Sequence, residues 1–340
     1  MGYSRCAVLA AMSIMLFSLH VQAADVTPTL SYPSGGKQLY EVPFAERHLP
    51  TITAKRWLKV SDGEMQTESP AFDREGNLLF VEVFGGQVLK IDKQKRLSIL
   101  VPKSSRGSAG LAIHKNGQLY VAGLGSSQEF GSITAFHPNG NFVRSVIDVE
   151  QRFVVDDLVF DSAGGFYFTD FKGTPTQPTG GVYYNSADGK TIPILRNMAL
   201  PNGIALSPDG KTLWVTEFAT GLLHRVELID AQTVAPFGEA VVYRFNGPSP
   251  DSMRVDEDGN LYIAMYTQGR VLVLNSNANP IGQILMPGRE EGRYLRTTSL
   301  AIKPGTNELF LVANDGDNGG GAAIFHARGF AKSLNLYSHQ

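Results

Sequence analysis

The sequence has almost no cysteine and no excess of charge of either sign. Its 340 residues include one cysteine, Cys6, and 30 Lys and Arg residues against 32 Asp and Glu residues. A disulfide framework is therefore excluded. The balanced charge gives no electrostatic footprint for nucleic acid or for an anionic membrane surface. We expect an ordinary soluble globular chain, whose partner has to be argued from a local site.

Long helical patterns and common catalytic motifs are also missing. No 12-residue stretch has a convincing helical period, which argues against a helix-rich fold. We find no Gly-x-Ser-x-Gly elbow, no His-Glu-x-x-His and no glycine-rich phosphate loop. The 36 glycines and 18 prolines instead indicate many tight turns.

Residues 1–23 have the pattern of a secretory signal peptide. Arg5 precedes an apolar run from Cys6 to Leu19, and small residues surround the expected cleavage point near Ala23. We expect a mature chain, residues 24–340, that lies in the periplasm or outside the cell. A buried N-terminal strand or a membrane anchor is the alternative interpretation.

Six segments repeat one pattern: an alternating apolar run, a polar turn, and a second, aromatic-rich alternating run. Their turn residues are spaced by 41, 47, 46, 49 and 47 positions and are Gly76, Gly117, Gly164, Gly210, Gly259 and Thr306. This period suits four short strands, the size of one propeller blade. The repeat predicts an all-β, six-bladed β-propeller over residues 24–340. Two β-sandwiches or a β-helix are the competing all-β interpretations.

The repeat also predicts a ring of polar side chains at one mouth of the central channel. Eight positions before each turn stand Glu68, Ala109, Asp156, Asn202, Asp251 and Thr298. Carboxylates that converge in a narrow channel repel one another unless a cation is present. Their oxygen donors favour Ca²⁺, and Mg²⁺ or Mn²⁺ would also suit them better than Zn²⁺. We therefore expect a central metal site.

A second polar ring follows from the same alignment, at the end of the second run. It consists of Glu82, Asp170, Glu217 and Met265, which are followed by Val83, Phe171, Phe218 and Tyr266. These side chains could orient metal ligands or line an amphipathic substrate pocket. The aromatic residues could equally be core between blades.

Several motifs resemble a known family. The segment Leu200-Pro-Asn-Gly-Ile-Ala-Leu-Ser-Pro-Asp-Gly, with Glu68 and Pro250-Asp-Ser, is similar to the senescence marker protein, gluconolactonase and luciferin-regenerating-enzyme family of six-bladed propellers. Residues 156–171, 260–273 and 280–289 resemble its bacterial calcium-dependent lactonases. The resemblance runs from about residue 51 to residue 331.

The resemblance implies two calcium sites. The first would be a catalytic Ca²⁺ held by Glu68, Asp156, Asn202 and Asp251, with Ser252 adjacent and Asp251 as acid/base. The second, structural Ca²⁺ would lie near Glu129, Gly131 and Asp148, with Gln151 and Phe153. Here Glu129 replaces a serine and the loop is about one residue shorter, so the second site departs from the family pattern.

The expected activity is calcium-dependent hydrolysis of a small lactone by a monomeric, gluconolactonase-like enzyme. The ion would polarise the lactone carbonyl while Asp251 moves the proton. One alternative is a non-catalytic, calcium-stabilised propeller that binds a protein or carbohydrate, because propellers carry many functions. A strictosidine-synthase-like or paraoxonase-like esterase is another.

Overall fold

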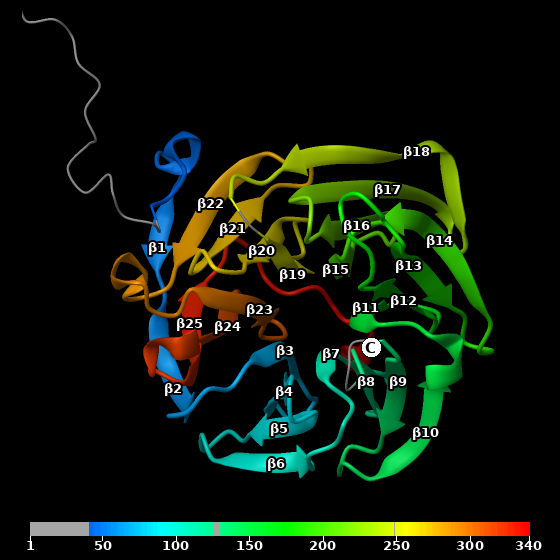
Figure 1. Ribbon diagram of the computed structural model, residues 1–340, viewed down its shortest axis with the longest axis horizontal. Coiled ribbons are helices and arrows are strands. Elements are labelled where there is room, and N and C mark those ends of the chain that lie inside the picture. Colours follow the sequence, from blue (N-terminus) through cyan, green and yellow to red (C-terminus); the bar gives the residue numbers. More distant parts are fainter. Residues whose placement is uncertain (1–40, 126–128, 248) are drawn as a thin grey trace, which may run out of the picture. The chain divides into compact units, whose positions relative to one another are not determined.

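The computed structural model describes residues 41–125, 129–247 and 249–340 (Figure 1). The predicted signal peptide, residues 1–23, lies outside these ranges. In the described part, the helices are 3₁₀ turns of three residues each. None of these helices is long and apolar enough to span a lipid bilayer.

Six antiparallel sheets are arranged around a channel, so the predicted six-bladed propeller is confirmed (Figure 1). Blades 1 to 3 contain β3 (Thr67–Phe72), β4 (Leu78–Glu82), β5 (Gln87–Ile91), β6 (Leu97–Val101); β7 (Ser108–Ile113), β8 (Leu119–Gly123), β9 (Ser132–Phe136), β10 (Phe142–Ile147); β11 (Val155–Phe160), β12 (Phe166–Asp170), β13 (Gly180–Asn185) and β14 (Thr191–Met198).

Blades 4 to 6 follow in the same order around the ring. They contain β15 (Pro201–Leu206), β16 (Thr212–Glu217), β17 (Leu222–Asp230), β18 (Thr233–Arg244); β19 (Pro250–Val255), β20 (Leu261–Met265), β21 (Arg270–Leu274), β22 (Pro280–Leu285); β23 (Arg296–Ile302), β24 (Glu308–Asn314) and β25 (Ala322–Arg328). The first strand of each blade is innermost and contacts the first strands of its neighbours (Figure 1).

The repeated hairpin turn explains the 46-residue pattern locally. In blade 3, a carboxylate oxygen of Asp161 accepts hydrogen bonds from the amides of Ala163 (2.8 Å) and Gly165 (3.0 Å). Gly164 has a φ of 94°, in the left-handed region that favours glycine. Asp256 makes the corresponding pair of bonds in blade 5. The polar turn thus satisfies its own amides.

The N-terminal segment closes the ring in a way that the repeat did not predict. β2 (Lys55–Ser61) pairs antiparallel with β25 and supplies the outer strand of blade 6. β1 (Thr51–Thr53) pairs parallel with β22 and becomes a fifth strand of blade 5. A buried ion pair between Glu46 and Arg270 (2.5 Å) anchors the residues that lead into β1.

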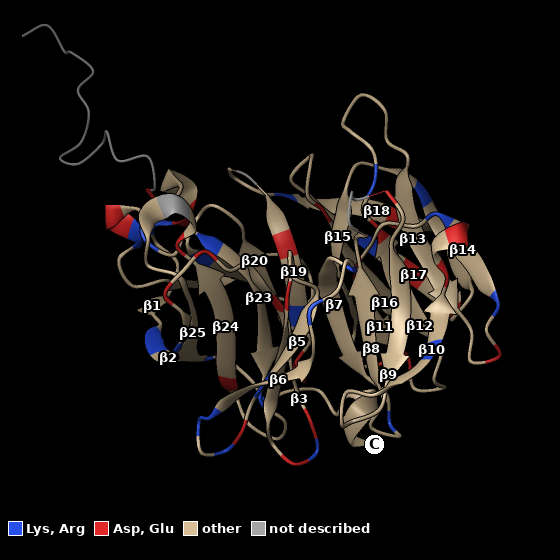
Figure 2. Cartoon of the chain, turned by 60° about the horizontal axis from the view of Figure 1, so that its bottom comes forward, with Lys and Arg blue, Asp and Glu red and all other residues tan. Residues whose placement is uncertain are grey.

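Apolar side chains fill the space between neighbouring blades. One cluster between blades 2 and 3 combines Ile133 and Ala135 with Phe166 and Phe168, all buried. Figure 2 shows that most charged residues lie in turns and loops rather than on the strands. The strands therefore pack as hydrophobic layers, and a buried charge on one of them needs a separate explanation.

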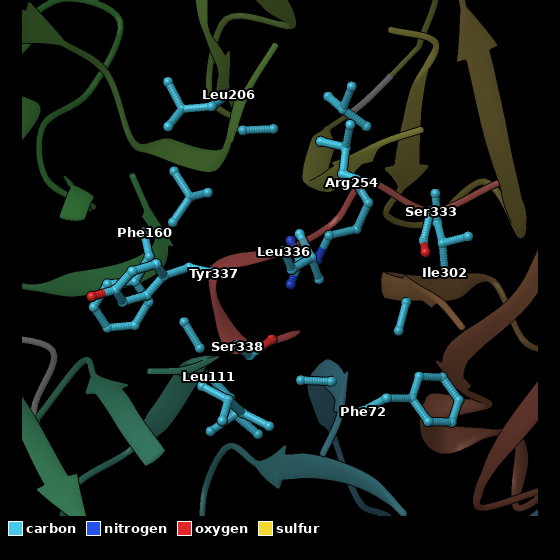
Figure 3. A pocket seen from close by; sticks show the side chains of 18 of the residues that line it. Phe72, Leu111, Phe160, Leu206, Arg254, Ile302, Ser333, Leu336, Tyr337 and Ser338 are labelled. Atoms are coloured by element: carbon cyan, nitrogen blue, oxygen red, sulfur yellow. The ribbon is translucent and has the colours of Figure 1, made fainter. Parts of the chain in front are cut away.

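The C-terminal tail, residues 331–340, covers the end of the channel opposite the predicted ring. Arg74 donates hydrogen bonds to the carbonyls of Ser338 (2.8 Å) and Gln340 (2.7 Å), and Tyr337 packs on Phe160. A cavity of about 120 Å³ lies between the tail and the second halves of the inner strands (Figure 3). Its walls are mainly apolar, with Arg254 reaching in from β19.

Candidate active site

The four predicted oxygen donors lie at matching places on the inner strands. The second residue of the strand is Glu68 in β3, Asp156 in β11, Asn202 in β15 and Asp251 in β19. Each is between 4% and 8% exposed, so all four side chains are buried. Because the inner strands start at the same end of the channel, these groups gather at one mouth. The predicted ring is therefore present in the fold.

A β-bulge re-aims the backbone at each ring position. Between the pairs Val155–Asp170 and Leu158–Phe168, β11 has one residue more than β12. The same one-residue shift occurs at the ring residues of β15 and β19 and at this level in β7 and β23, whereas in β3 it comes directly after Glu68, which pairs with Val81. Bulges bend a strand locally and redirect its side chains, often beside active sites. Each of the six inner strands thus has a bulge near its start, and we call these six bulges the frame of the ring.

Two buried threonines fix this frame in blades 3 to 5. Thr169 accepts a hydrogen bond from the amide of Asp157 (3.1 Å) and donates one to the carbonyl of Asn202 in the next blade (2.8 Å). Thr216 makes the same two bonds one blade further on, to the bulge amide of β15 (2.8 Å) and to the carbonyl of Asp251 (2.9 Å). Each threonine thus ties its own bulge to the following ring residue. Sequence reasoning missed both residues.

The second acidic ring supports the first through the backbone. Asp170 accepts the amide of Val154 (2.7 Å) and Glu217 accepts the amide of Ala199 (3.0 Å), just before the ring residues of blades 3 and 4. These bonds match the interpretation that the ring orients metal ligands. Glu82 instead accepts two amides of its own turn, those of residues 84 and 85.

Strained backbone precedes two of the ring residues. Leu200 has a φ of 52° and Ser249 a φ of 86°, each two positions before the ring residue of its blade. Non-glycine residues in this region cost on the order of 1–3 kcal/mol and cluster at functional sites. The strained residues lie in the loops that lead into β15 and β19, so this backbone conformation costs stability beside the ring residues.

Two ring oxygens have no hydrogen-bond partner in the described structure. They are Oε2 of Glu68 and Oδ1 of Asn202, both fully covered from solvent. Leaving such an atom unpaired costs on the order of 1–3 kcal/mol. Both atoms are free to bind a ligand at this point.

The ring carboxyls have strongly perturbed acidity. Burial raises the pKa of Glu68 well above its usual value, and the nearby Asp251 and Asp156 carboxylates raise it further. Burial also raises the pKa of Asp251 well above its ordinary range, again with a contribution from Asp156. Burial and the adjacent Asp157 do the same for Asp156. These groups are close enough to repel one another when ionised.

This arrangement fits a hard cation in its donors but is not a ready-made metal site. In residues 41–125, 129–247 and 249–340, no group of three or more His, Cys, Asp and Glu side chains has metal-binding geometry. The central metal site therefore stays a prediction. Three carboxylates and one amide, with an unpaired oxygen on Glu68 and another on Asn202, provide the oxygen-only chemistry that suits Ca²⁺, and also Mg²⁺ or Mn²⁺.

A fourth carboxylate and an arginine complete the centre, and neither was predicted. Asp157 is completely buried and accepts a hydrogen bond from Nη1 of Arg254 (3.2 Å). The two residues are far apart in the sequence, and each looks like one more charged residue of a strand. The spacing rule selected only the residue at the ring position, so it passed over both.

The mouth of the channel carries a partly exposed aromatic arc. The ring centroids of Phe171 and Phe218 are 5.8 Å apart, and those of Phe218 and Tyr266 are 5.9 Å apart. All three side chains are half-buried, whereas Val83 is buried in a small core. The interpretation as core holds for Val83, and the interpretation of the aromatic residues as the wall of a substrate pocket stays a prediction.

An open pocket of about 540 Å³ lies on the same face, over blades 2 and 3. Its lining comes from the segments before β7 and β11 and from the connection between β8 and β9, and it includes Arg106, Arg152 and Glu150. Nη1 of Arg106 is buried and has no hydrogen-bond partner in the described part of the chain. The pocket thus has a mixed charged lining of two arginines and one glutamate.

The residues of the predicted second calcium site fall into separate pairs. The amide of Gly131 donates to the carbonyl of Phe153 (2.6 Å), and the amide of Asp148 donates to Oε1 of Gln151 (3.1 Å). Glu129 is exposed. Nothing in this geometry tests whether an ion binds here, so the second site stays a prediction.

With this geometry established, comparison with known proteins identifies the family. The family described as "SMP-30/Gluconolactonase/LRE-like region" matches residues 66–312. The chain belongs to this family. The match spans all six inner strands, and the resemblance predicted from the motifs is confirmed.

The chain is also similar to individual relatives. It is 46% identical over 315 residues to "Lactonase drp35" of Staphylococcus saprophyticus, covering 91% of this chain and 97% of that protein. It is 46% identical over 319 residues to the protein of the same name from Staphylococcus aureus strain USA300, covering 92% and 98%.

Solved structures show the same fold at lower identity. A calcium-binding regucalcin from Agrobacterium tumefaciens has a TM-score of 0.68 at 18% identity, over 84% of this chain and 98% of that chain. A luciferin-regenerating enzyme has a TM-score of 0.65 at 20% identity, over 81% and 98%.

Proposed function

We propose that this protein is a calcium-dependent lactonase. The observation that carries the proposal is the set of buried oxygen donors at one channel mouth, two of which have no partner. The relatives named lactonase, at 46% identity over nearly the whole chain, support this reaction class. Ca²⁺ suits the donor set best, although Mg²⁺ or Mn²⁺ would also suit it.

Glu68, Asp156, Asn202 and Asp251 would hold the ion, with Ser252 beside them. A bound divalent cation supplies Lewis-acid polarisation of a carbonyl and favours ionisation of water. The buried threonines and the second acidic ring keep the ligand backbone fixed, so binding would require movement of the ring side chains rather than of the strands. Pre-organisation of this kind is what a catalytic site requires.

Asp251 is the proposed acid/base. Its carboxylate takes a proton from the water that attacks the lactone carbonyl, and it returns that proton to the ring oxygen as the carbon–oxygen bond breaks. The products are one hydroxy acid and no other species. Asp251 is buried, and its Oδ1 accepts a hydrogen bond from the amide of Ser252 (3.0 Å), which fixes the orientation of the carboxylate.

The aromatic arc is the proposed contact for the apolar part of the substrate. Burial is the main reason for the raised pKa of Tyr266, and the carboxylates of Asp251 and Glu68 raise it further. Half-buried aromatic faces next to a polar centre suit a small molecule with one polar edge.

The test is an assay of the purified protein with an aldonolactone and with an aromatic lactone. We expect hydrolysis in the presence of Ca²⁺ that stops on addition of EGTA and returns with excess Ca²⁺. A protein whose melting temperature responds to Ca²⁺ but which opens neither lactone would instead be a calcium-stabilised binding propeller. Broad turnover of open-chain esters would favour the esterase alternative.

Four further parts of the proposal concern the chain rather than the reaction. A second Ca²⁺ would bind near Glu129, Gly131, Asp148, Gln151 and Phe153, and calcium stoichiometry by calorimetry tests this.

Residues 1–23 would be removed as a signal peptide, leaving the propeller domain 24–340 in the periplasm or outside the cell. The N-terminal sequence of the exported protein tests both the cleavage and the export. The protein would be a monomer, which sedimentation would show.

A further inference from the structure

Arg254 crosses the channel below the ring. It lies on β19 of blade 5, and its Nη1 donates hydrogen bonds to Oδ2 of Asp157 in blade 3 (3.2 Å) and to the carbonyl of Met253 (2.6 Å). The contact therefore passes blade 4, which lies between the two strands. Figure 3 shows the arginine side chain extending from β19 into the middle of the lower cavity.

Asp157 is held firmly in this position. Its side chain is completely buried, and Oδ1 accepts the amide of Leu158 (2.9 Å). Asp157 directly follows the ring residue Asp156 within the same bulge. Both of its carboxylate oxygens have a partner, Oδ1 in the amide of Leu158 and Oδ2 in Arg254.

The charge of the centre depends on this contact. The Asp157 carboxylate acts electrostatically on Glu68, Asp156 and Asp251, so the four acids form one cluster. Arg254 contributes a positive charge to that cluster at its lower edge. A buried charge that loses its partner is strongly destabilising, so the contact with Arg254 constrains the buried Asp157 carboxylate.

We propose that Arg254 determines which cation the ring accepts. By pairing with Asp157 it limits the ring to three carboxylates and one amide, and it lowers the negative potential at the ion. Both effects favour a divalent over a trivalent ion. This inference rests on the proposed function only in that the ring binds a cation.

The substitution Arg254→Met removes the charge and frees Asp157. Coulomb interaction scales with the charge of the ion, so both ions should bind more tightly and Tb³⁺ should gain more than Ca²⁺. We expect the ratio of Tb³⁺ to Ca²⁺ affinity to rise by about tenfold or more, measured by terbium luminescence and calcium competition. The increase in melting temperature caused by Ca²⁺ should also become larger.

Three matched variants separate this role from a structural one. Arg254→Lys keeps the charge and should keep the wild-type ratio. The double variant Asp157→Asn/Arg254→Met removes both charges and should return the ratio toward wild type. Arg225→Met removes one positive charge from an exposed pair with Glu227 on β17, and it should leave the ratio unchanged.

The outcomes distinguish this inference from the proposed function. If Glu68→Gln leaves calcium affinity unchanged, the ion does not bind at the ring and the proposed function fails. If Glu68→Gln weakens binding but Arg254→Met leaves the Tb³⁺ to Ca²⁺ ratio unchanged, the role of Arg254 is wrong. If Arg254→Met does not fold, two other variants test the role of Arg254. Arg254→Lys should keep the wild-type ratio of Tb³⁺ to Ca²⁺ affinity, and Asp157→Asn alone should lower that ratio. Failure of either result would show that Arg254 does not determine which cation binds.

Discussion

The two ends of the channel are made by the same six strands and yet have opposite chemistry. At the upper end, the strands begin with buried acids and an amide, including Glu68 and Asp251. At the lower end, three to five residues further along, the same strands present apolar side chains such as Leu111 and Ile302 to a cavity that the C-terminal tail covers. Arg254 and Asp157 lie between the two regions.

The difference shows how a repeat can carry a site at one end and stability at the other. At the upper end, neighbouring strands approach closely: a Cβ on Gly203 would lie 2.5 Å from the carbonyl oxygen of Asp251, and one on Gly110 would lie 2.4 Å from that of Asp156. Such contacts leave no room for larger residues there. The lower end is packed by large side chains, so substitutions there should lower the stability of the fold and leave lactone hydrolysis unaffected.

The largest expected effect is at the upper end. Asp251→Asn keeps an oxygen donor but removes the proposed base, so lactone hydrolysis at saturating Ca²⁺ should fall on the order of 10²- to 10⁴-fold, while calcium still binds with an affinity lowered about as much as in Glu68→Gln. Steady-state kinetics and calorimetry on the same sample measure both. Wild-type turnover in this variant would show that another group moves the proton.

The corresponding substitution at the lower end is Tyr337→Ala. Tyr337 is buried and packs on Phe160 and His114, with ring centroids 5.4 and 5.0 Å apart. Its removal should cost about 3–5 kcal/mol in the free energy of unfolding, since aromatic truncation in a core leaves a cavity. Calcium affinity should not change. Denaturant unfolding and calcium titration together test this, with Tyr337→Phe as the control that keeps the ring.

The ring residues could be predicted from the sequence, but the contacts that support them could not. The hairpin repeat has a constant offset between turn and strand start, so Glu68, Asp156, Asn202 and Asp251 could be aligned without coordinates. The contact of Arg254 with Asp157 spans 97 residues and two blades, and no local pattern indicates it. β1, β2 and the tail lie outside the repeat, so their positions depended on tertiary packing that the period does not describe.

A smaller effect is expected for Glu68→Gln. The amide retains an oxygen but loses one negative charge, so calcium affinity should fall by about tenfold or more. The calcium-free protein should become more stable at neutral pH, because burial and the neighbouring acids disfavour the ionised carboxyl. Calorimetry and thermal melting in EDTA check the two parts. Destabilisation in EDTA would contradict the repulsion described for the ring.

The smallest expected effect is a pH trend in stability. Burial raises the pKa of Glu68, Asp156 and Asp251, so the folded protein retains protons that the unfolded chain loses above about pH 4. The calcium-free protein should therefore lose stability as pH rises from about 4 toward these raised values. Calcium binds the ionised acids, so the calcium-induced increase in melting temperature should grow over this interval. An increase that is independent of pH would contradict this linkage.

The central claim is that the upper ring binds a divalent cation, and anomalous diffraction tests it most directly. A crystal grown with Ca²⁺ should show one anomalous difference peak within coordination distance of oxygens of Glu68, Asp156, Asn202 and Asp251. The same peak should be missing from a Glu68→Ala crystal. A wild-type crystal with full calcium loading elsewhere and no peak at this mouth would contradict the account.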